Sequence, residues 1–246
     1  MFNCISPRQR YRLACVGLAT LSCLASNCFT LPLAAQEQPS QKPATQQQGA
    51  ETSAAATKPD RPERSSSRRA IGYYSDAAGY QNKGAYSLAI EEWEKLLDEF
   101  PDDPLASKAW HYLGICYTQL EKPEYATAAD AFTQALRDPG LEVREESLIN
   151  LAWCQFSQGR AGEPGSAEQR QGLEQARQRL EEFLKDYPDG RYLDQAYFYL
   201  GEIEYALGEV SKSIPYYEKL LDTPALQKST LRPGGLYALA VVNEEV

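Results

Sequence analysis

The chain has 246 residues, of which 43% are hydrophobic and 24% are charged, and its net charge is −9. The charge is uneven, because residues 1–70 carry nine Lys and Arg against four Asp and Glu, whereas residues 71–246 carry 16 against 30. The acidic character of residues 71–246 argues against nucleic acid or an anionic membrane surface as their partner.

The first 35 residues have the pattern of an export signal. Three arginines precede an apolar run over residues 13–29, and small residues follow it, ending at Ala35. This order of basic, apolar and small residues is typical of a signal peptide. We expect cleavage after Ala35, with a site after Ala25 as second choice, and delivery to the periplasm or cell envelope. The alternative is that residues 13–35 remain as an inner-membrane anchor, because the apolar run approaches the length of a span.

Residues 36–70 are of low complexity. They contain runs of glutamine, alanine and serine, several prolines and no aromatic residue. Such a segment cannot bury enough apolar surface to offset the entropy that it loses on ordering. We therefore predict a disordered linker. Near its end lie Arg61, Arg64, Arg68 and Arg69, and we favour a role in spacing the domain from the membrane over a binding role for this positive charge.

Two linked helix patterns stand out between residues 110 and 139. The first is W-x2-L-G-x2-Y, and the second is A-x3-F followed by a proline. These positions are occupied by Trp110, Leu113, Gly114, Tyr117, Ala128, Phe132 and Pro139. The large apolar residues form a helical stripe, the small ones suit helices that cross closely, and the proline ends the second helix. The combined pattern resembles the tetratricopeptide repeat, a helix–turn–helix unit of 34 residues.

The second-helix pattern occurs four times in residues 71–246. Its four sets are Ala89, Trp93, Leu96; Ala128, Phe132, Ala135; Ala176, Leu180, Phe183; and Ser213, Tyr217, Leu220. Glycines at Gly84, Gly159 and Gly208 fall where we expect the turns between paired helices. The resemblance therefore implies an all-α fold over residues 71–246, a right-handed solenoid of about four helical hairpins.

The repeat pattern is imperfect at two internal positions and at the end of the chain. Gln155 and Glu204 stand where an aromatic residue is expected at the end of a first helix. Residues 236–246 resemble the first helix of a fifth unit without its second helix. They form either a terminal cap or part of a further unit in a longer protein.

Two short segments resemble bacterial envelope proteins that contain this repeat. Residues 100–103 and 187–190 read Phe-Pro-Asp-Asp and Tyr-Pro-Asp-Gly, and each leads into a helix rich in alanine and tyrosine. In this they look like the tetratricopeptide lipoprotein of the outer-membrane β-barrel assembly machine and the Tol-Pal-associated cell-division coordinator. The resemblance implies a role in the envelope, although no cysteine here has the preceding sequence that lipid attachment requires.

A second apolar stripe on the first helices is the candidate binding site. In tetratricopeptide proteins these helix offsets face a concave groove that binds an extended segment or a helix of a partner. The residues at these offsets are Tyr74, His111, Ile149, Trp153, Phe156, Phe198, Glu202 and Tyr205. We expect an apolar, aromatic groove with an acidic rim, in which Trp153 is partly exposed. The alternative is that the loop at residues 160–166 or the terminal helix covers these side chains.

No pattern in the chain indicates catalysis. His111 is the one histidine, no set of cysteines and histidines has zinc spacing, and Gly-x-Ser-x-Gly is absent. Paired glutamates on amphipathic helices are solvated unless a pocket desolvates one of them. We therefore predict no enzyme activity, no cofactor and no metal.

The predicted function is a non-catalytic protein–protein interaction scaffold of the bacterial cell envelope, with other envelope proteins or peptides as partners. The alternative is a carbohydrate-binding or accessory module of an envelope enzyme, in which Trp153 stacks on sugar rings, or the N-terminal part of a longer protein.

Only two cysteines lie outside the leader, Cys116 and Cys154. Both follow the small residue of a first helix by two positions, where the family has a small buried residue. We expect both to be core residues that behave as small hydrophobes. Since they occupy equivalent positions on neighbouring first helices, we expect them to lie too far apart to form a disulfide.

Overall fold

The computed structural model describes residues 65–246, so the predicted signal peptide and most of the predicted linker lie outside the described residues. This part of the chain contains nine α-helices, one 3₁₀-helix and no strand. The helices are α2 (Arg68–Asn82), α3 (Tyr86–Glu99), α4 (Ala106–Thr118), α5 (Tyr125–Ala135), α6 (Arg144–Ala161), α7 (Ala167–Asp186), α8 (Leu193–Ala206), α9 (Val210–Asp222), η3 (Pro224–Leu226) and α10 (Arg232–Glu245).

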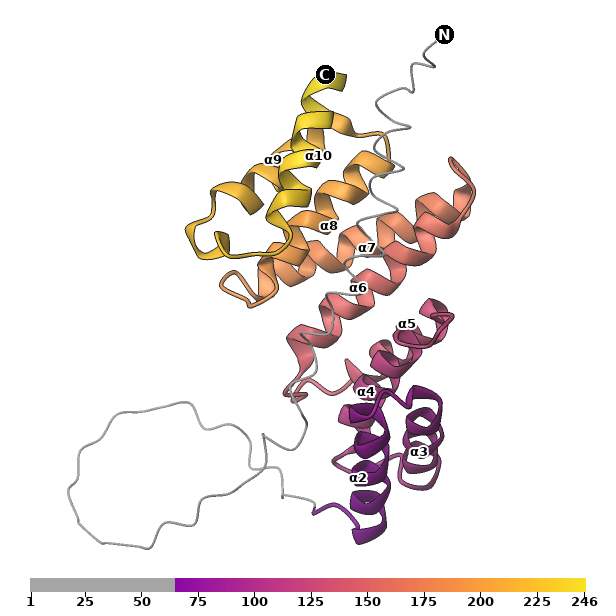
Figure 1. Ribbon diagram of the computed structural model, residues 1–246. Helices are drawn as coiled ribbons and strands as arrows, with labels where there is room; N and C mark the ends of the chain where they lie inside the picture. The colour runs from indigo at the N-terminus through magenta and orange to yellow at the C-terminus, as the bar shows by residue number, and fades with distance from the viewer. Residues whose placement is uncertain (1–64) are drawn as a thin grey trace, which may run out of the picture.

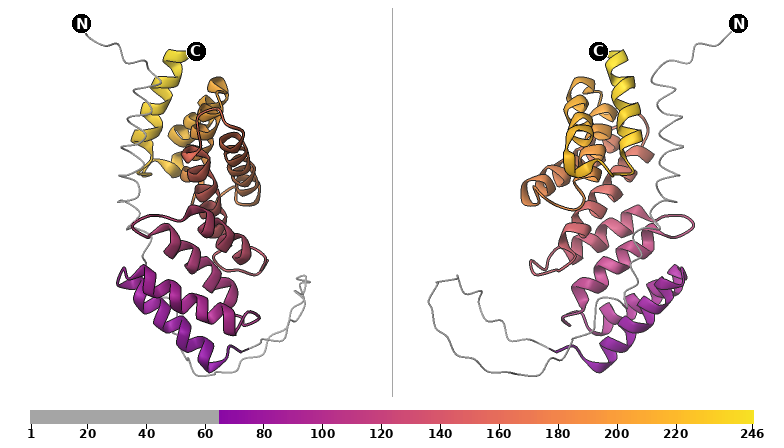
Figure 2. Two further views of the ribbon diagram at one scale, coloured as in Figure 1. Left: turned by 90° about the vertical axis from the view of Figure 1, so that its right-hand side faces the viewer. Right: turned by 60° about the vertical axis from the view of Figure 1, so that its left-hand side comes forward.

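The helices follow one another in space in the order in which they occur in the chain. Figure 1 shows α2–α5 at one end of the molecule, α6 and α7 in the middle and α8–α10 at the other end, and Figure 2 shows the same stacking from two other sides. Each helix packs against its neighbour in sequence, and α6 also contacts α4 and α8. The four hairpins α2–α3, α4–α5, α6–α7 and α8–α9 form the all-α helical repeat solenoid that the sequence predicts.

The first described helix, α2, begins at Arg68, inside the range 36–70 predicted to be the linker. The Ala70 N–H donates to the Ser67 hydroxyl at 3.0 Å, which is a helix N-cap. The Ser67 N–H in turn donates to Asp103 Oδ2 at 3.0 Å. These contacts fasten the start of α2 to the segment that follows α3.

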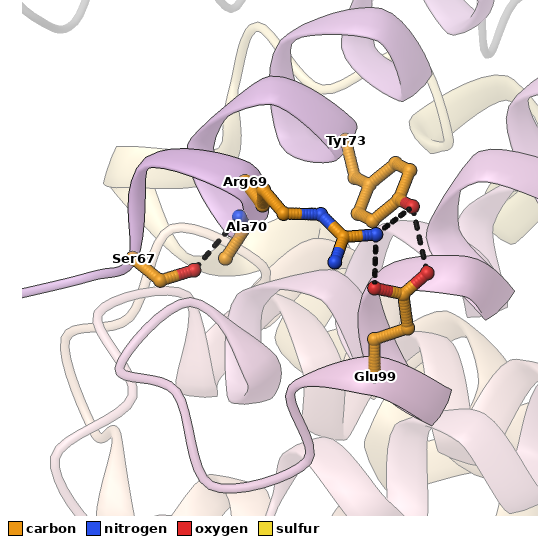
Figure 3. A network of polar contacts seen from close by, with 5 residues as sticks. All are labelled: Ser67, Arg69, Ala70, Tyr73 and Glu99. Carbon is orange, nitrogen blue, oxygen red and sulfur yellow. Dashed lines mark hydrogen bonds and ion pairs between the residues drawn. The ribbon is translucent and has the colours of Figure 1, made fainter.

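A polar network also ties α2 to α3, as Figure 3 shows. Arg69 Nη2 lies 2.7 Å from Glu99 Oε2 and donates to the Tyr73 hydroxyl at 3.2 Å. The Tyr73 hydroxyl donates to Glu99 Oε1 at 2.7 Å. The Arg69 guanidinium carbon lies 5.9 Å from the ring centres of both Tyr73 and Phe100. One carboxylate and two aromatic rings therefore hold this arginine side chain.

The repeat residues identified in the sequence form the core. All twelve members of the four second-helix sets are completely buried, with exposed fractions of 0%. Gly114 shows why a small residue is needed opposite them, because a Cβ there would lie 2.9 Å from the ring of Phe132. Gly201 faces the ring of Tyr217 in the same way. The small residue lets the aromatic ring fill the space between the two helices of a hairpin.

Two of the three predicted turn glycines lie in turns. Gly84 and Gly208 have φ angles of +73° and +85°, in the left-handed region that glycine adopts without steric cost. Gly159 lies inside α6 instead, and a Cβ there would lie 3.0 Å from the backbone nitrogen of Leu173 on α7. The prediction of a turn at Gly159 is wrong, because α6 continues past it and uses the glycine for a close crossing with α7.

Candidate functional site

The eight residues predicted to line a groove lie on α2, α4, α6 and α8, the first helices of the four hairpins. Four of them are buried: His111, Ile149, Phe156 and Glu202. The other four are partly exposed: Tyr74, Trp153, Phe198 and Tyr205. Only the partly exposed group can offer side-chain surface to a partner without rearrangement of the fold.

Trp153 is at the centre of an aromatic patch, which we define as Tyr125, Trp153 and Tyr199. The ring centre of Trp153 lies 5.0 Å from that of Tyr199 on α8 and 6.4 Å from that of Tyr125 on α5. The indole is partly exposed, as the sequence predicts, while one side of it packs against the core. Because the three rings come from three successive hairpins, the patch exists only in the stacked solenoid.

Two members of the patch, Tyr125 and Tyr199, are not predicted from the sequence. Tyr125 is the first residue of a second helix, α5, and Tyr199 directly follows the predicted residue Phe198 on α8. Neither position lies on the predicted stripe, so the helical period could not select it. The run of three aromatic residues at positions 197–199 was the one available signal.

The last helix, α10, covers the predicted stripe on α8. A Cβ at Gly234 would lie 3.2 Å from the ring of Phe198. The Tyr205 hydroxyl donates to Glu245 Oε1 at 2.8 Å. For Phe198 and Tyr205, the chain's own terminal helix therefore occupies much of the space that the groove hypothesis left for a partner.

Glu202 has a buried partner in the core. The Tyr217 hydroxyl donates to Glu202 Oε1 at 3.0 Å, and both side chains are buried. A buried hydrogen bond to a carboxylate is strong, and removal of the donor leaves the acceptor desolvated. The contact joins the two helices of the α8–α9 hairpin, which gives Glu202 a structural role.

His111 lies at the contact between α4 and α6. Its Nδ1 is 2.8 Å from the Ser147 hydroxyl, which donates to the Val143 carbonyl at 2.9 Å. Since that donation uses the hydroxyl proton, Nδ1 carries the imidazole proton and donates to Ser147. Nε2 is buried without a hydrogen-bond partner, 3.7 Å from Glu146 Oε1. Burial lowers the pKa of His111 to about 3 and raises the pKa of Glu146, so the imidazole is neutral at pH 7.

Tyr74 belongs to an aromatic cluster inside the first two hairpins. Its ring centre lies 4.9 Å from that of Trp93, at an interplanar angle of 80°, and 6.2 Å from that of Tyr112. Trp93 and Tyr112 stack with their ring centres 5.6 Å apart. Edge-to-face and stacked pairs both stabilise packing. Tyr74 is therefore the partly exposed edge of a cluster that joins α2, α3 and α4.

Cys116 and Cys154 are completely buried and free, as the sequence predicts. Burial raises the pKa of both thiols to about 12, so neither is a reactive thiolate at neutral pH. Within residues 65–246, no group of three or more His, Cys, Asp or Glu side chains could hold a metal ion. None of the helices in that same part of the chain combines the length and the apolarity needed to cross a bilayer.

Comparison with known families agrees with this architecture. The tetratricopeptide repeat model matches residues 75–140 and 166–227, which together make up just over half of the chain. The matched ranges contain α3–α5 and α7–α9, where the buried repeat residues lie. No curated protein matches the sequence. From the stacked hairpins, the buried repeat residues and this match, we conclude that the chain belongs to the tetratricopeptide repeat family.

Proposed function

We propose that this protein is an interaction scaffold of the bacterial cell envelope and that its aromatic patch binds an apolar helix or peptide of another envelope protein. The observation that carries the proposal is the position of Trp153, a partly exposed indole between tyrosines of the preceding and following hairpins. Large aromatic side chains of this kind are frequent hot spots of protein interfaces. Proteins of the tetratricopeptide repeat family are generally non-catalytic, and their repeats suggest protein–protein interaction.

The character of the partner follows from the groups around the patch. The partly exposed rings of Trp153 and Tyr125 offer an apolar surface, and the buried ring of Tyr199 packs against Trp153. An amphipathic helix can lay its apolar face on such a surface. The domain around the patch is acidic, with 16 Lys and Arg against 30 Asp and Glu in residues 71–246. A partner helix with an apolar face and neutral or basic flanks therefore fits better than one with acidic flanks.

The envelope location rests on the leader, residues 1–35, with its basic, apolar and small segments in that order. Its test is N-terminal sequencing of the protein from fractionated bacterial cells. We expect a mature chain that starts at Gln36 and is recovered from the periplasm or the outer envelope. A chain that starts at Met1 in the inner-membrane fraction would support the anchor at residues 13–35 instead. Recovery of the intact chain from the cytosol would contradict the proposal.

The binding proposal is tested by Trp153→Leu, with Tyr80→Leu as the matched control. Both aromatic residues are partly exposed and lie on first helices of hairpins, α6 and α2. Leucine keeps apolar contact with the core but removes the broad ring. We expect Trp153→Leu to lose most of the envelope proteins that the wild-type protein captures after cross-linking, while Tyr80→Leu retains them.

Thermal unfolding followed by circular dichroism checks that both variants fold. Equal capture by wild-type protein and a folded Trp153→Leu variant would contradict the proposal. A parallel screen with peptidoglycan fragments separates the carbohydrate-binding alternative. Glycan binding that Trp153→Leu abolishes, without loss of captured proteins, would assign the patch to sugar rings.

A further inference from the structure

A cleft of about 420 Å³ lies between α3 and α5, with α4 as its floor. We call it the α3–α5 cleft. Its lining residues are Glu94, Leu97, Asp98, Trp110, Leu113, Tyr117, Thr127, Asp130, Ala131 and Gln134. None of them belongs to the aromatic patch, so the cleft is a separate surface of the solenoid.

The α3–α5 cleft combines an aromatic floor with an acidic edge. Trp110 and Tyr117 are partly exposed on the floor, and Glu94, Asp98 and Asp130 are exposed around it. No Lys or Arg is among the lining residues, and within residues 65–246 none of the three carboxylates forms an ion pair. Aromatic faces and carboxylates both attract cations, so the cleft has the chemistry of a site for a positively charged side chain.

One of the three carboxylates is held in a defined orientation. The Tyr117 hydroxyl donates to Glu94 Oε1 at 2.6 Å. Figure 3 shows the same tyrosine-to-glutamate donation at the other edge of α3, where Tyr73 holds Glu99 and Arg69 completes the site. In the α3–α5 cleft the tyrosine and the glutamate are present without a cation from the described part of the chain.

The α8–α9 hairpin has an equivalent surface, which can be aligned through the buried repeat positions. Gly114 corresponds to Gly201, and Phe132 corresponds to Tyr217, because each glycine packs on the ring of its own hairpin. Four cleft residues then have these equivalents: Trp110 and Tyr197, Tyr117 and Glu204, Ala131 and Tyr216, Gln134 and Lys219.

In the α8–α9 hairpin, side chains of the protein itself fill this space. The Lys219 ammonium lies 5.6 Å from the ring centre of Tyr197, which is a cation–π contact. Arg177 of the preceding helix, α7, places its Nη1 3.6 Å from Glu204 Oε1. The ring of Tyr216 occupies the position where the first cleft has only the methyl group of Ala131. The equivalent site therefore supplies its own cations, whereas the α3–α5 cleft has neutral Gln134 at the place of the lysine.

We propose that the α3–α5 cleft is a docking site for an arginine or lysine side chain in a segment of a partner protein. The ammonium or guanidinium group lies on the Trp110 and Tyr117 rings and pairs with Glu94 and Asp98. This assignment goes beyond the scaffold function proposed above, because it uses a different surface and a charged rather than an apolar anchor. The partner segment needs only one basic residue with apolar neighbours, since the partly exposed rings of Trp110 and Tyr117 supply apolar contact.

The test is a titration of the ¹⁵N-labelled full chain with a short acetylated peptide that has one arginine between two leucines. The control peptide has citrulline in place of arginine, which keeps the shape of the side chain and removes its charge. We expect saturable NMR shifts at the Trp110 indole N–H and at amides of residues 94–98 and 127–134 with the arginine peptide. We expect the citrulline peptide to bind at least about tenfold more weakly.

The sharpest variant copies the α8–α9 hairpin into the cleft. Ala131→Tyr with Gln134→Lys should fill the site and supply its cation, and we expect it to weaken arginine-peptide binding by about tenfold or more. Glu94→Gln keeps an acceptor for the Tyr117 hydroxyl, lies on an exposed position, and should weaken binding as well. Circular dichroism and the melting temperature confirm that each variant is folded.

Four outcomes would overturn the proposal. These are the absence of shifts in the cleft, equal binding of the citrulline peptide, unchanged binding by the folded Glu94→Gln variant, and shifts confined to Trp153 and its neighbours. A fifth outcome would also overturn it. If the arginine peptide binds only after replacement of Arg61 and Arg64, these arginines of the chain itself compete with the peptide for the cleft.

Discussion

The α3–α5 cleft and its equivalent in the α8–α9 hairpin are built on the same arrangement of helices. They differ in whether cationic side chains of the protein itself lie beside their aromatic rings and carboxylates. In the α8–α9 hairpin, Lys219 lies on the ring of Tyr197, and Arg177 from α7 pairs with Glu204. In the first cleft, Trp110 is partly exposed, and the carboxylates of Glu94, Asp98 and Asp130 are exposed beside it. The buried repeat residues therefore specify the hairpins. The partly exposed residues beside them decide whether the surface of a hairpin stays open for a partner.

The cores of the two regions differ much less. Phe132 and Tyr217 fill the same space opposite a glycine, and both are completely buried. These two side chains differ only in the Tyr217 hydroxyl, which donates to Glu202. The largest effects of mutation are therefore expected at the shared core positions, and smaller effects at positions that distinguish the regions.

The largest effect tests whether the two regions depend equally on the shared core. Phe132→Ala and Tyr217→Ala should each lower the free energy of unfolding by about 3–5 kcal/mol, because each leaves a cavity between the helices of its hairpin. Urea unfolding followed by circular dichroism measures both. A loss below about 1 kcal/mol in either variant would mean that its hairpin does not depend on that side chain.

Tyr217→Phe gives the second region the same aromatic ring as the first. The ring remains, but Glu202 loses one hydrogen bond in a buried site, and we expect a loss of about 1–3 kcal/mol in the free energy of unfolding. The double variant with Glu202→Leu removes both polar partners and should recover much of that loss. An unchanged stability of Tyr217→Phe would show that another donor satisfies Glu202.

His111 makes the contact between α4 and α6 sensitive to pH. Its folded-state pKa, about 3, lies below the ordinary value of 6.5, so below pH 6.5 the unfolded chain binds a proton that the folded chain does not. Stability attributable to His111 therefore falls by about 1.4 kcal/mol for each pH unit below 6.5. Glu146 acts in the opposite direction at acidic pH, because burial raises its pKa.

The pH effect is isolated by comparison with His111→Asn, since the asparagine amide can replace Nδ1 as the donor to Ser147 but does not titrate in this range. The measured quantity is the difference in free energy of unfolding between wild type and variant at pH 7.5 and pH 5.5. We expect the wild type to lose more stability on acidification. Parallel losses in the two proteins would exclude His111 as the cause.

The smallest effect concerns the cation of the second region. Lys219 is exposed, and Lys219→Gln should lower stability by only about 0.5–1 kcal/mol through the lost contact with the Tyr197 ring. The same change with Tyr216→Ala would place at this site the two α5 residues of the first cleft, Ala131 and Gln134, while Tyr197 and Glu204 remain. Binding of the arginine peptide by this double variant at the α8–α9 hairpin would show that these two positions decide whether the site is open. Its absence would show that Trp110, Tyr117 or the carboxylates of the first cleft are also required.

Much of the fold could be predicted because the hydrophobic period reports which face of a helix is buried within its own hairpin. The twelve repeat residues are all buried for that reason. Only part of the candidate site could be predicted in the same way. Trp153 is partly exposed as expected, but Ile149 and Phe156 on the same stripe belong to the core shared with α8. A helix that packs between two neighbours can bury two of its faces. The spacing of apolar residues along the sequence does not show whether the second face is buried by a neighbouring helix or exposed to solvent.

The sequence by itself determined the helical hairpins, their small-to-aromatic packing and the acidic character of the domain, because these depend on residue type and local spacing. The tertiary structure alone decided that Gly159 serves a helix crossing, that α10 covers Phe198, and that Tyr125 and Tyr199 meet Trp153. Each of these contacts joins residues that are distant along the chain. Their geometry depends on how the hairpins stack, which is set by the packing of whole helices rather than by the pattern within any one of them.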